Sequence, residues 1–273
     1  MKFDRKYDVV VAGGGIAGVA AAIAAARRGA KTALIEKTVY PGGLATAGVV
    51  FMYLPLCDGN GTQVTYGLAE ELLQRSLKYG PGDIPDYWLG DKDADKSERY
   101  AVDFSPASFM LALDEVMQES GVDIWYDTVI TDTTVESGTL EAIEVCNKSG
   151  KGTINAKCFV DATGDADLAY YSGHACIEER NPMSIWGIEY VEEEVSGRRE
   201  LGKNTVVFAY GGGHDVKMDD AGINGRLVSN FVLKGRNHYR EKLNADYGSE
   251  KHTRNSRFPV MLPAMAQYRT TRR

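Results

Sequence analysis

Cysteine and histidine are scarce in this sequence, with four of each among 273 residues. The cysteines form no C-x-x-C pair, and no histidine stands near them at the spacing of a metal site; they are Cys57, Cys146, Cys158 and Cys176. We therefore expect no metal site and no disulfide framework, which fits a reducing compartment. No cleavage-type site follows the start MKFDRKYDVV, so we expect a cytoplasmic protein without a secretory signal.

An excess of positive charge is also lacking. The chain has 31 Lys and Arg against 38 Asp and Glu, a formal net charge of -7. Such a surface repels phosphate backbones, so we expect no nucleic-acid partner. With 44% hydrophobic and 25% charged residues, the composition is that of a globular protein with a sizeable core.

One uncharged run, residues 9–26, approaches the length of a membrane span. Its glycines at 13–15 break it, because each glycine in a helix costs about 1 kcal/mol against alanine. The residues before them are β-branched, and those after them are alanine-rich up to a basic stop at Arg27 and Arg28. We predict a strand at 7–11, a helix at 16–28 and a strand at 31–36. This is a βαβ unit, and we expect no membrane association.

The turn of this βαβ unit carries the pattern G-x-G-x-x-G at Gly13, Gly15 and Gly18. The first glycine permits a tight turn, the second lets backbone approach a pyrophosphate, and the third lets the helix pack closely on the sheet. The pyrophosphate then lies at the helix N-terminus, where free N–H groups favour negative charge. Glu36 ends the second strand, where its carboxylate would accept hydrogen bonds from ribose hydroxyls. The pattern predicts a dinucleotide site.

Two further stretches favour FAD over NAD. TVYPGGLATAGVV follows Glu36-Lys37 as a glycine-rich loop suited to an extended cofactor, although Pro41 alone would also fit a surface turn. CFVDATGDADLAYYSG predicts a strand at 158–161, a turn and a short helix, for which Asp165 is the simplest N-cap.

Taken together, the glycine turn with Glu36, PGGLATAG and NKSG…AKCFVDATGDADLA resemble the FAD-dependent oxidoreductases related to the glutathione-reductase-type flavoproteins. The resemblance covers about residues 7–173 and returns in LPAMAQYRTTRR. It implies FAD as the cofactor. The implied fold is an α/β Rossmann-like FAD/NAD(P)-binding fold with an inserted antiparallel β-meander and a second α+β substrate domain.

The resemblance also implies roles for single positions. The start of the first helix, with Gly13, Gly15, Ile16, Ala17 and Gly18, would hold the pyrophosphate. Glu36 would bind the adenosine ribose, with Lys37 near the adenine and Val129 offering it backbone groups. Residues that would run past the pyrophosphate toward the flavin are Gly42, Gly43 and Leu44. Residues that would close over the adenosine side are Ala162, Thr163, Gly164 and Asp165.

The remaining residues predict the helices and strands that support the site and a second domain that covers it. Apolar stripes predict helices at 66–79 and from Ser105-Pro106 to Gly121, the second with Ser105 as its N-cap and proline in its first turn. Strand-like runs follow at 122–131, 140–148 and 152–161. We expect an FAD-binding domain at 1–173, with a meander at about 124–157, and a substrate or cap domain at 174–262. Residues 263–273 would begin a return to the FAD domain. In the cap we expect a strand before Gly211–Gly213 and a helix at 223–243. We do not expect the glycine run at 211–213 to form a second dinucleotide site.

A late glycine-rich segment closes the FAD site in flavoproteins of this architecture, and none is found before Arg273. We expect a truncated product, a proteolytic fragment or one half of a split enzyme. A homo-oligomer or a partner chain would then complete the fold.

We expect hydride transfer between a small organic substrate and flavin N5. Arg269 could bind a carboxylate or carbonyl of that substrate, and Cys57 could be redox-active. The alternatives are an NAD-dependent dehydrogenase and a non-catalytic or incomplete flavin-binding subunit.

Overall fold

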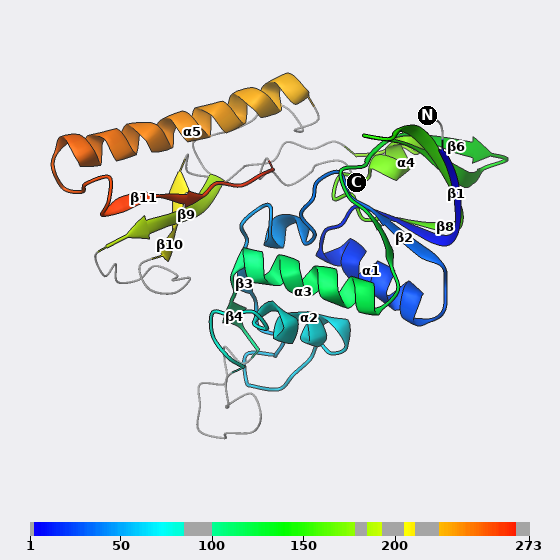
Figure 1. Ribbon diagram of the computed structural model, residues 1–273, viewed down its shortest axis with the longest axis horizontal. Coiled ribbons are helices and arrows are strands. Elements are labelled where there is room, and N and C mark those ends of the chain that lie inside the picture. The colour runs from blue at the N-terminus through cyan, green and yellow to red at the C-terminus, as the bar shows by residue number, and fades with distance from the viewer. Residues whose placement is uncertain (1–2, 85–99, 178–184, 193–204, 211–223, 266–273) are drawn as a thin grey trace.

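A six-stranded sheet forms the centre of the computed structural model, which describes residues 3–84, 100–177, 185–192, 205–210 and 224–265. The strand order is β5-β2-β1-β8-β7-β6 (Figure 1). The strands are β1 (Phe3–Ala12), β2 (Thr32–Ile35), β5 (Asp123–Trp125), β6 (Val129–Glu136), β7 (Thr139–Asn147) and β8 (Gly150–Asp161). The α/β fold class predicted from the sequence is confirmed.

The predicted βαβ unit is present at the start of the chain. β1 leads through the glycine turn into α1 (Ile16–Arg27), and β2 returns parallel to β1 with Val9 opposite Thr32. β1 extends further toward the N-terminus than the predicted 7–11 because its first residues pair with β8. Within the described ranges, no helix is long and apolar enough to cross a membrane.

β8 joins the parallel and antiparallel halves of the sheet. Its residues 152–161 pair in parallel with β1, while residues 150–155 pair antiparallel with β7. The β6-β7-β8 meander therefore continues the parallel sheet. The run at 122–131, expected as one strand, is two strands, because Asp127 has a φ of 49° and turns the chain between them. β5 joins the parallel side beside β2, and β6 joins the meander.

Three helices cover one face of the sheet: α1, α2 (Leu68–Ser76) and α3 (Pro106–Glu119). The Ser105 hydroxyl caps α3 by accepting from Ser108 N, as predicted. α2 is shorter than the predicted 66–79 because it starts after Gly67, whose φ is 69°. A two-stranded antiparallel sheet of β3 (Met52–Tyr53) and β4 (Val102–Asp103) lies next to these helices, and α4 (Asp167–Tyr171) packs Leu168 on the opposite face.

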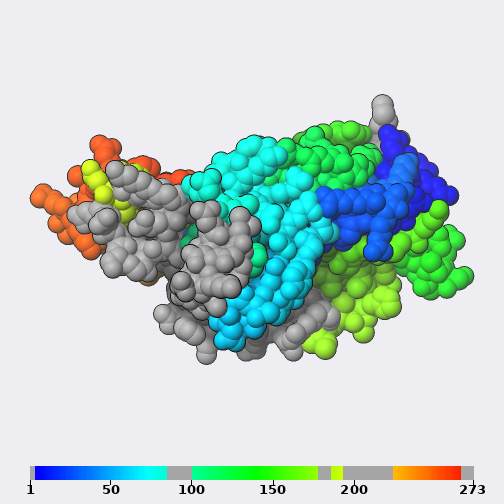
Figure 2. All heavy atoms as spheres, turned by 90° about the horizontal axis from the view of Figure 1, so that it is seen from below, coloured from blue at the N-terminus to red at the C-terminus, as the bar shows by residue number. Residues whose placement is uncertain are grey.

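A second unit consists of a three-stranded sheet and a long helix, and it lies at one end of the molecule (Figures 1 and 2). Its elements are β9 (Ile185–Val191), β10 (Thr205–Tyr210), α5 (Gly225–Gly248) and β11 (Arg257–Met261), with β9 in the middle of the sheet. The expected strand and helix of this region are confirmed, and the Asn224 side chain caps α5. Gly211–Gly213 lie outside the described residues.

A buried ion pair holds α5 against this small sheet. Glu189 is 0% exposed, and its carboxylate accepts three hydrogen bonds of 3.0 Å from the Arg257 guanidinium, two at Oε2 and one at Oε1. The Tyr239 hydroxyl of α5 donates to the same carboxylate at 3.1 Å. Burial and the Glu189 charge raise the pKa of Tyr239, so the phenol stays protonated and remains a donor. A buried charge is tolerated here because it is paired on several sides.

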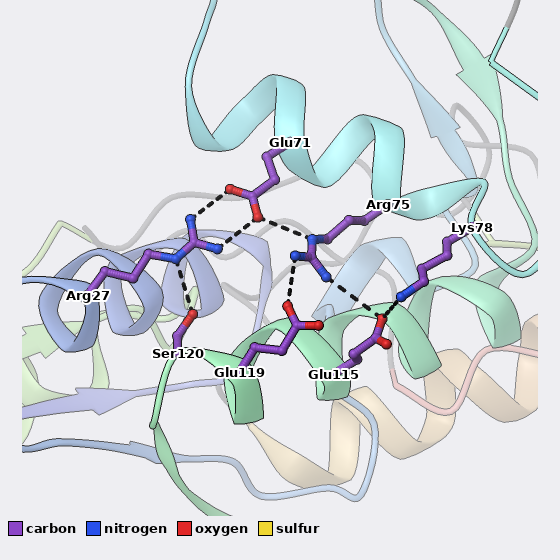
Figure 3. A network of polar contacts seen from close by, with 7 residues as sticks. All are labelled: Arg27, Glu71, Arg75, Lys78, Glu115, Glu119 and Ser120. Atoms are coloured by element: carbon purple, nitrogen blue, oxygen red, sulfur yellow. Dashed lines mark hydrogen bonds and ion pairs between the residues drawn. The ribbon is translucent and has the colours of Figure 1, made fainter.

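An ion network ties the three covering helices together at the surface (Figure 3). Arg27 of α1 contacts Glu71 of α2 at 2.7 Å. Arg75, one turn further along α2, contacts Glu71 at 3.1 Å and Glu119 of α3 at 2.8 Å. Glu71 thus bridges two guanidinium groups, and its hydrogen bond with Arg27 and the charges of both arginines hold its pKa below the usual value.

The ion pairs of Glu71 are expected to make the unfolding free energy depend on pH in the acid range. Because the Glu71 carboxyl has a lowered pKa in the folded chain, its contribution is present above its ordinary pKa of 4.5 and is lost as the pH falls below it. Glu71→Gln is expected to lose about 1 kcal/mol of unfolding free energy at pH 7, the scale of two partly exposed ion pairs. Urea unfolding from pH 7 to pH 3 measures the difference.

The variant and the wild type are expected to converge toward pH 3. Glu70→Gln is the matched control, since its carboxylate accepts from the Gln63 and Gln74 amides. A loss in Glu71→Gln that stays constant down to pH 3 would exclude the charge of Glu71 as its cause.

Candidate functional site

The turn between β1 and α1 leaves no room for side chains at two of its glycines. A Cβ on Gly13, whose φ is 97°, would lie 2.4 Å from the Ala162 carbonyl oxygen. A Cβ on Gly18 would lie 1.9 Å from the Gly13 carbonyl oxygen. β1, α1 and the turn after β8 therefore meet at van der Waals distance, and only glycine fits at either position.

Gly15 differs from these two glycines because its side-chain position faces open space. A Cβ built on Gly15 meets no atom within 4 Å. Gly15 is the N-cap of α1, so no N-cap side chain accepts a hydrogen bond from the first N–H groups of the helix. This space at a helix N-terminus suits an anion that approaches the backbone closely.

The second glycine motif lies directly against the first. Gly42 N donates to the Gly14 carbonyl at 2.7 Å, and a Cβ on Gly43 would lie 2.9 Å from the Cα of Gly15. From there a short 3-10 turn, Gly43–Ala45, carries the chain onward, with Leu44 47% exposed. The sequence places these motifs 27 residues apart, from Gly15 to Gly42, and the structure brings them into contact through an isolated parallel bridge.

Glu36 orients its carboxylate toward the glycine turn. One oxygen accepts from Gly14 N at 2.7 Å, and the other accepts from Thr38 N and the Thr38 hydroxyl, both at 2.8 Å. A side chain at Gly14 would be in tight contact with Glu36, since a Cβ there would be 3.0 Å from the Glu36 Cβ. A carboxylate offers about four acceptor positions, so Glu36 retains capacity for one ribose hydroxyl. Neither Gly14 nor Thr38 was identified from the sequence.

The chain beyond Glu36 lies beside the end of β5. Thr128 N donates to the Glu36 carbonyl and Asp127 N to the Thr38 carbonyl, both at 3.1 Å. Lys37 and Val129 are exposed at this edge. The structure thus brings Lys37 and Val129 to one end of the site, and their roles near an adenine stay predictions.

Tyr126, also missed in the sequence, fixes the end of β5. Its hydroxyl donates to Asp114 of α3 in a short hydrogen bond. Burial, this hydrogen bond and the charges of Asp114 and Glu36 raise the pKa of Tyr126.

The turn after β8 is held by Asp161. One carboxylate oxygen accepts from Thr163 N at 3.2 Å and from the Thr163 hydroxyl at 2.8 Å, and the other accepts from the N–H groups that start α4. These N–H groups belong to Leu168 and Ala169. Asp161 therefore fixes the turn of Ala162, Thr163 and Gly164 against the first glycine motif.

The expectation that Asp165 caps α4 is wrong. The N-cap residue is Ala166, in a left-handed conformation with a φ of 52° and without a side-chain cap bond. The extra residues in the turn let Asp161, from the strand itself, reach the helix start instead. Asp165 remains in the turn at intermediate exposure, among the residues that the resemblance assigns to the adenosine side.

Of the two catalytic candidates, Cys57 lies within the described residues. Cys57 lies in a loop beyond β3, where it forms an isolated antiparallel bridge with Gln63. Arg269 lies outside the described residues. Among the residues that the structure describes, no group of three or more His, Cys, Asp or Glu side chains could hold a metal ion.

A loop with a strained residue connects the site to the second unit. Val49 is fully buried and has a φ of 61°, a conformation that is a genuine outlier for a β-branched residue. Such strain costs on the order of 1–3 kcal/mol and persists only where the surroundings enforce it. The Trp186 indole N–H, from β9, donates to the carbonyls of Gly48 and Val49, each at 3.1 Å.

Comparison with known proteins adds a family match. A family model described as FAD dependent oxidoreductase matches residues 8–221. A search of curated proteins finds no match.

Several solved structures share the fold. A geranylgeranyl bacteriochlorophyll reductase-like protein from Thermoplasma acidophilum has 17% identity and a TM-score of 0.56, covering 95% of this chain and 65% of its own. A p-nitrophenol 4-monooxygenase from Pseudomonas putida has 14% identity and a TM-score of 0.58, covering 94% and 66%. An L-proline dehydrogenase from P. horikoshii has 13% identity and a TM-score of 0.52, covering 85% and 77%. The chain thus spans just under two thirds of the length of the first two, and at these identities the likeness concerns the fold.

The Asp161 contacts predict a stability effect. Asp161→Asn replaces one acceptor oxygen by an amide donor, so some of the four hydrogen bonds that the Asp161 carboxylate accepts are lost. We expect a loss of about 1–2 kcal/mol in unfolding free energy, the cost of a lost helix cap. Asp165→Asn is expected to cost less than half as much. Denaturant unfolding of both variants tests this, and a larger loss in Asp165→Asn would contradict the capping role of Asp161.

Proposed function

The chain belongs to the FAD dependent oxidoreductase family, and we propose that it binds FAD between the start of α1 and the loop at 42–44. The observation that carries this proposal is the contact of two glycine motifs beside open space. Gly15 has no atom within 4 Å of its Cβ position, and Gly43 has no room for a side chain on the side that faces Gly15. Backbone of both motifs can thus approach the same diphosphate.

The pyrophosphate lies at the N-terminus of α1 in this proposal. Gly13 and Gly18 shape the turn, and Gly15, Ile16 and Ala17 supply backbone N–H groups and room for the phosphate oxygens. Gly42, Gly43 and Leu44 guide the cofactor from there toward the flavin. The turn of Ala162, Thr163, Gly164 and Asp165, held by Asp161, closes the adenosine side.

Glu36 accepts a hydrogen bond from the adenosine ribose. Its contacts to Gly14 and Thr38 fix the carboxylate before the cofactor arrives, so little side-chain entropy is lost on binding. A second negative charge on the ribose, such as the 2′-phosphate of NADP, would be repelled. Lys37 and Val129 flank the adenine, Val129 through its backbone groups.

The proposed reaction is hydride exchange between a small organic substrate and flavin N5. When bound, FAD supplies the redox chemistry, while the protein orients the reactants and excludes water. The unit formed by β9, β10, β11 and α5 provides the substrate-covering wall, within a cap domain at 174–262. Cys57 and Arg269 remain candidates for contact with the substrate.

The finer placement of the chain is also a proposal. The order of its motifs supports the glutathione-reductase type within the FAD-dependent enzymes. The scarcity of cysteine supports a cytoplasmic location. A homo-oligomer or a partner chain would complete the flavin end of the site.

Gly15→Ala tests the site directly. The added methyl group meets no protein atom, so we expect an unchanged melting temperature of the cofactor-free protein. The same methyl group occupies the space of the phosphate oxygens, so the FAD dissociation constant should rise about tenfold or more. Titration of the cofactor-free protein, followed by quenching of flavin fluorescence, measures the constant.

The matched control is Gly225→Ala, at the start of α5, where a Cβ also meets nothing within 4 Å. It should leave both the melting temperature and the FAD constant unchanged. Equal FAD affinity in Gly15→Ala and the wild type would contradict the proposed site. A wild type that binds NAD but not FAD would favour a dehydrogenase, and bound FAD that no substrate reduces would favour a non-catalytic subunit.

A further inference from the structure

Trp186 provides the side-chain polar contact between the second unit and the loop that leads away from the glycine motifs, beside a backbone contact in which Ala264 N donates to the Ala47 carbonyl at 2.8 Å. Its indole N–H lies 3.1 Å from two successive carbonyl oxygens, those of Gly48 and Val49. The next residue but one on the same strand, Ile188, packs into the core beneath that loop. β9 therefore presents one face to this loop and the other, with Glu189, to α5.

The loop needs such a link because Val49 is strained. A φ of 61° is unfavourable for valine, and Val49 is nevertheless fully buried in this conformation. Within the loop, Val49 N donates to the Thr46 carbonyl at 3.0 Å and Val50 N to the Leu44 carbonyl at 2.8 Å. The Trp186 indole N–H bridges the two carbonyls on either side of the Val49 Cα, so it contacts the strained residue from both sides.

The strained residue is directly connected to the proposed cofactor site. Gly48 N donates to the Gly43 carbonyl at 3.0 Å, and Gly43 is the residue that touches Gly15. A Cβ on Gly48 would lie 2.7 Å from the Cα of Leu44, so the two ends of the loop are in close contact. A shift at Gly48 and Val49 must therefore move Gly43 and Leu44.

We propose that Trp186 is a positioning residue for the flavin end of the site. By holding Val49 in its strained conformation from the second unit, it sets the path of residues 43–48 along the cofactor. This inference rests on the proposed FAD binding. Trp186 lies outside the nucleotide-binding motifs, and its effect on the bound cofactor depends on the conformation of Val49.

The experiment is a double-mutant cycle of Trp186→Phe and Val49→Gly, with the FAD dissociation constant as readout. Trp186→Phe keeps an aromatic ring in the core but removes the donor, so Val49 relaxes and the constant is expected to rise roughly fivefold. Glycine adopts a φ of 61° without strain. In the Val49→Gly background, Trp186→Phe should therefore change the constant by less than twofold.

Trp125→Phe is the matched control for loss of an indole donor. The Trp125 N–H donates to the Tyr7 hydroxyl at 3.1 Å, among residues packed on the opposite face of the sheet. The control should change the FAD constant by less than twofold in either background. The visible spectrum of bound FAD, a second readout, should change in Trp186→Phe and be restored in the double variant.

If Trp186→Phe does not fold, the wild type provides the test through its ¹⁵N-labelled indole signals. Trp88→Phe and Trp125→Phe assign the Trp186 signal by elimination, and FAD should shift the Trp186 signal but leave that of Trp125 in place. An equal effect of Trp186→Phe in both backgrounds, or an unshifted Trp186 signal at saturating FAD, would overturn the inference. Failure of the wild type to bind FAD would instead overturn the proposed function.

Discussion

The structure depends on one close backbone contact, where β1, α1 and the turn after β8 meet. Gly13 lies against the Ala162 carbonyl and Gly18 against the Gly13 carbonyl, at distances that exclude any side chain. This contact lets α1 start immediately at the end of β1 and pack flat on the sheet. It also fixes the turn of residues 162–165 beside the first helix turn. The space at Gly15 follows from it, because the helix N-terminus then lies just beyond the carboxyl end of β1.

Around this contact, the polar side chains act by fixing backbone. Glu36 holds Gly14, and Asp161 holds both its own turn and the start of α4. Trp186 holds Gly48 and Val49 from the second unit. The site is thus largely formed before any ligand binds, so a dinucleotide need not pay for ordering it. The two units meet at the loop that would carry the flavin, where a strained residue is buried.

The sequence predicts the parts of this arrangement that are local. The glycine spacing, the acid at the end of the second strand and the Ser105 cap each depend on residues within one βαβ unit or one helix turn, and the structure has the expected βαβ unit and cap. Contacts between distant segments could not be predicted. The reach of Asp161 across its turn, the conformation of Val49 and the hydrogen bonds of Trp186 depend on tertiary packing. The start of α4 is an example, because Asp165 lies close to it in sequence while the carboxylate that accepts from its N–H groups belongs to Asp161.

The central claim is that the two glycine motifs together hold the diphosphate of FAD. A crystal structure of the protein after soaking with FAD tests it most directly. We expect density for the pyrophosphate at the N-terminus of α1, within hydrogen-bonding distance of backbone N–H groups at 15–17 and next to Gly43, with the ribose at Glu36. FAD bound elsewhere, or a pyrophosphate that does not contact the start of α1, would contradict the account.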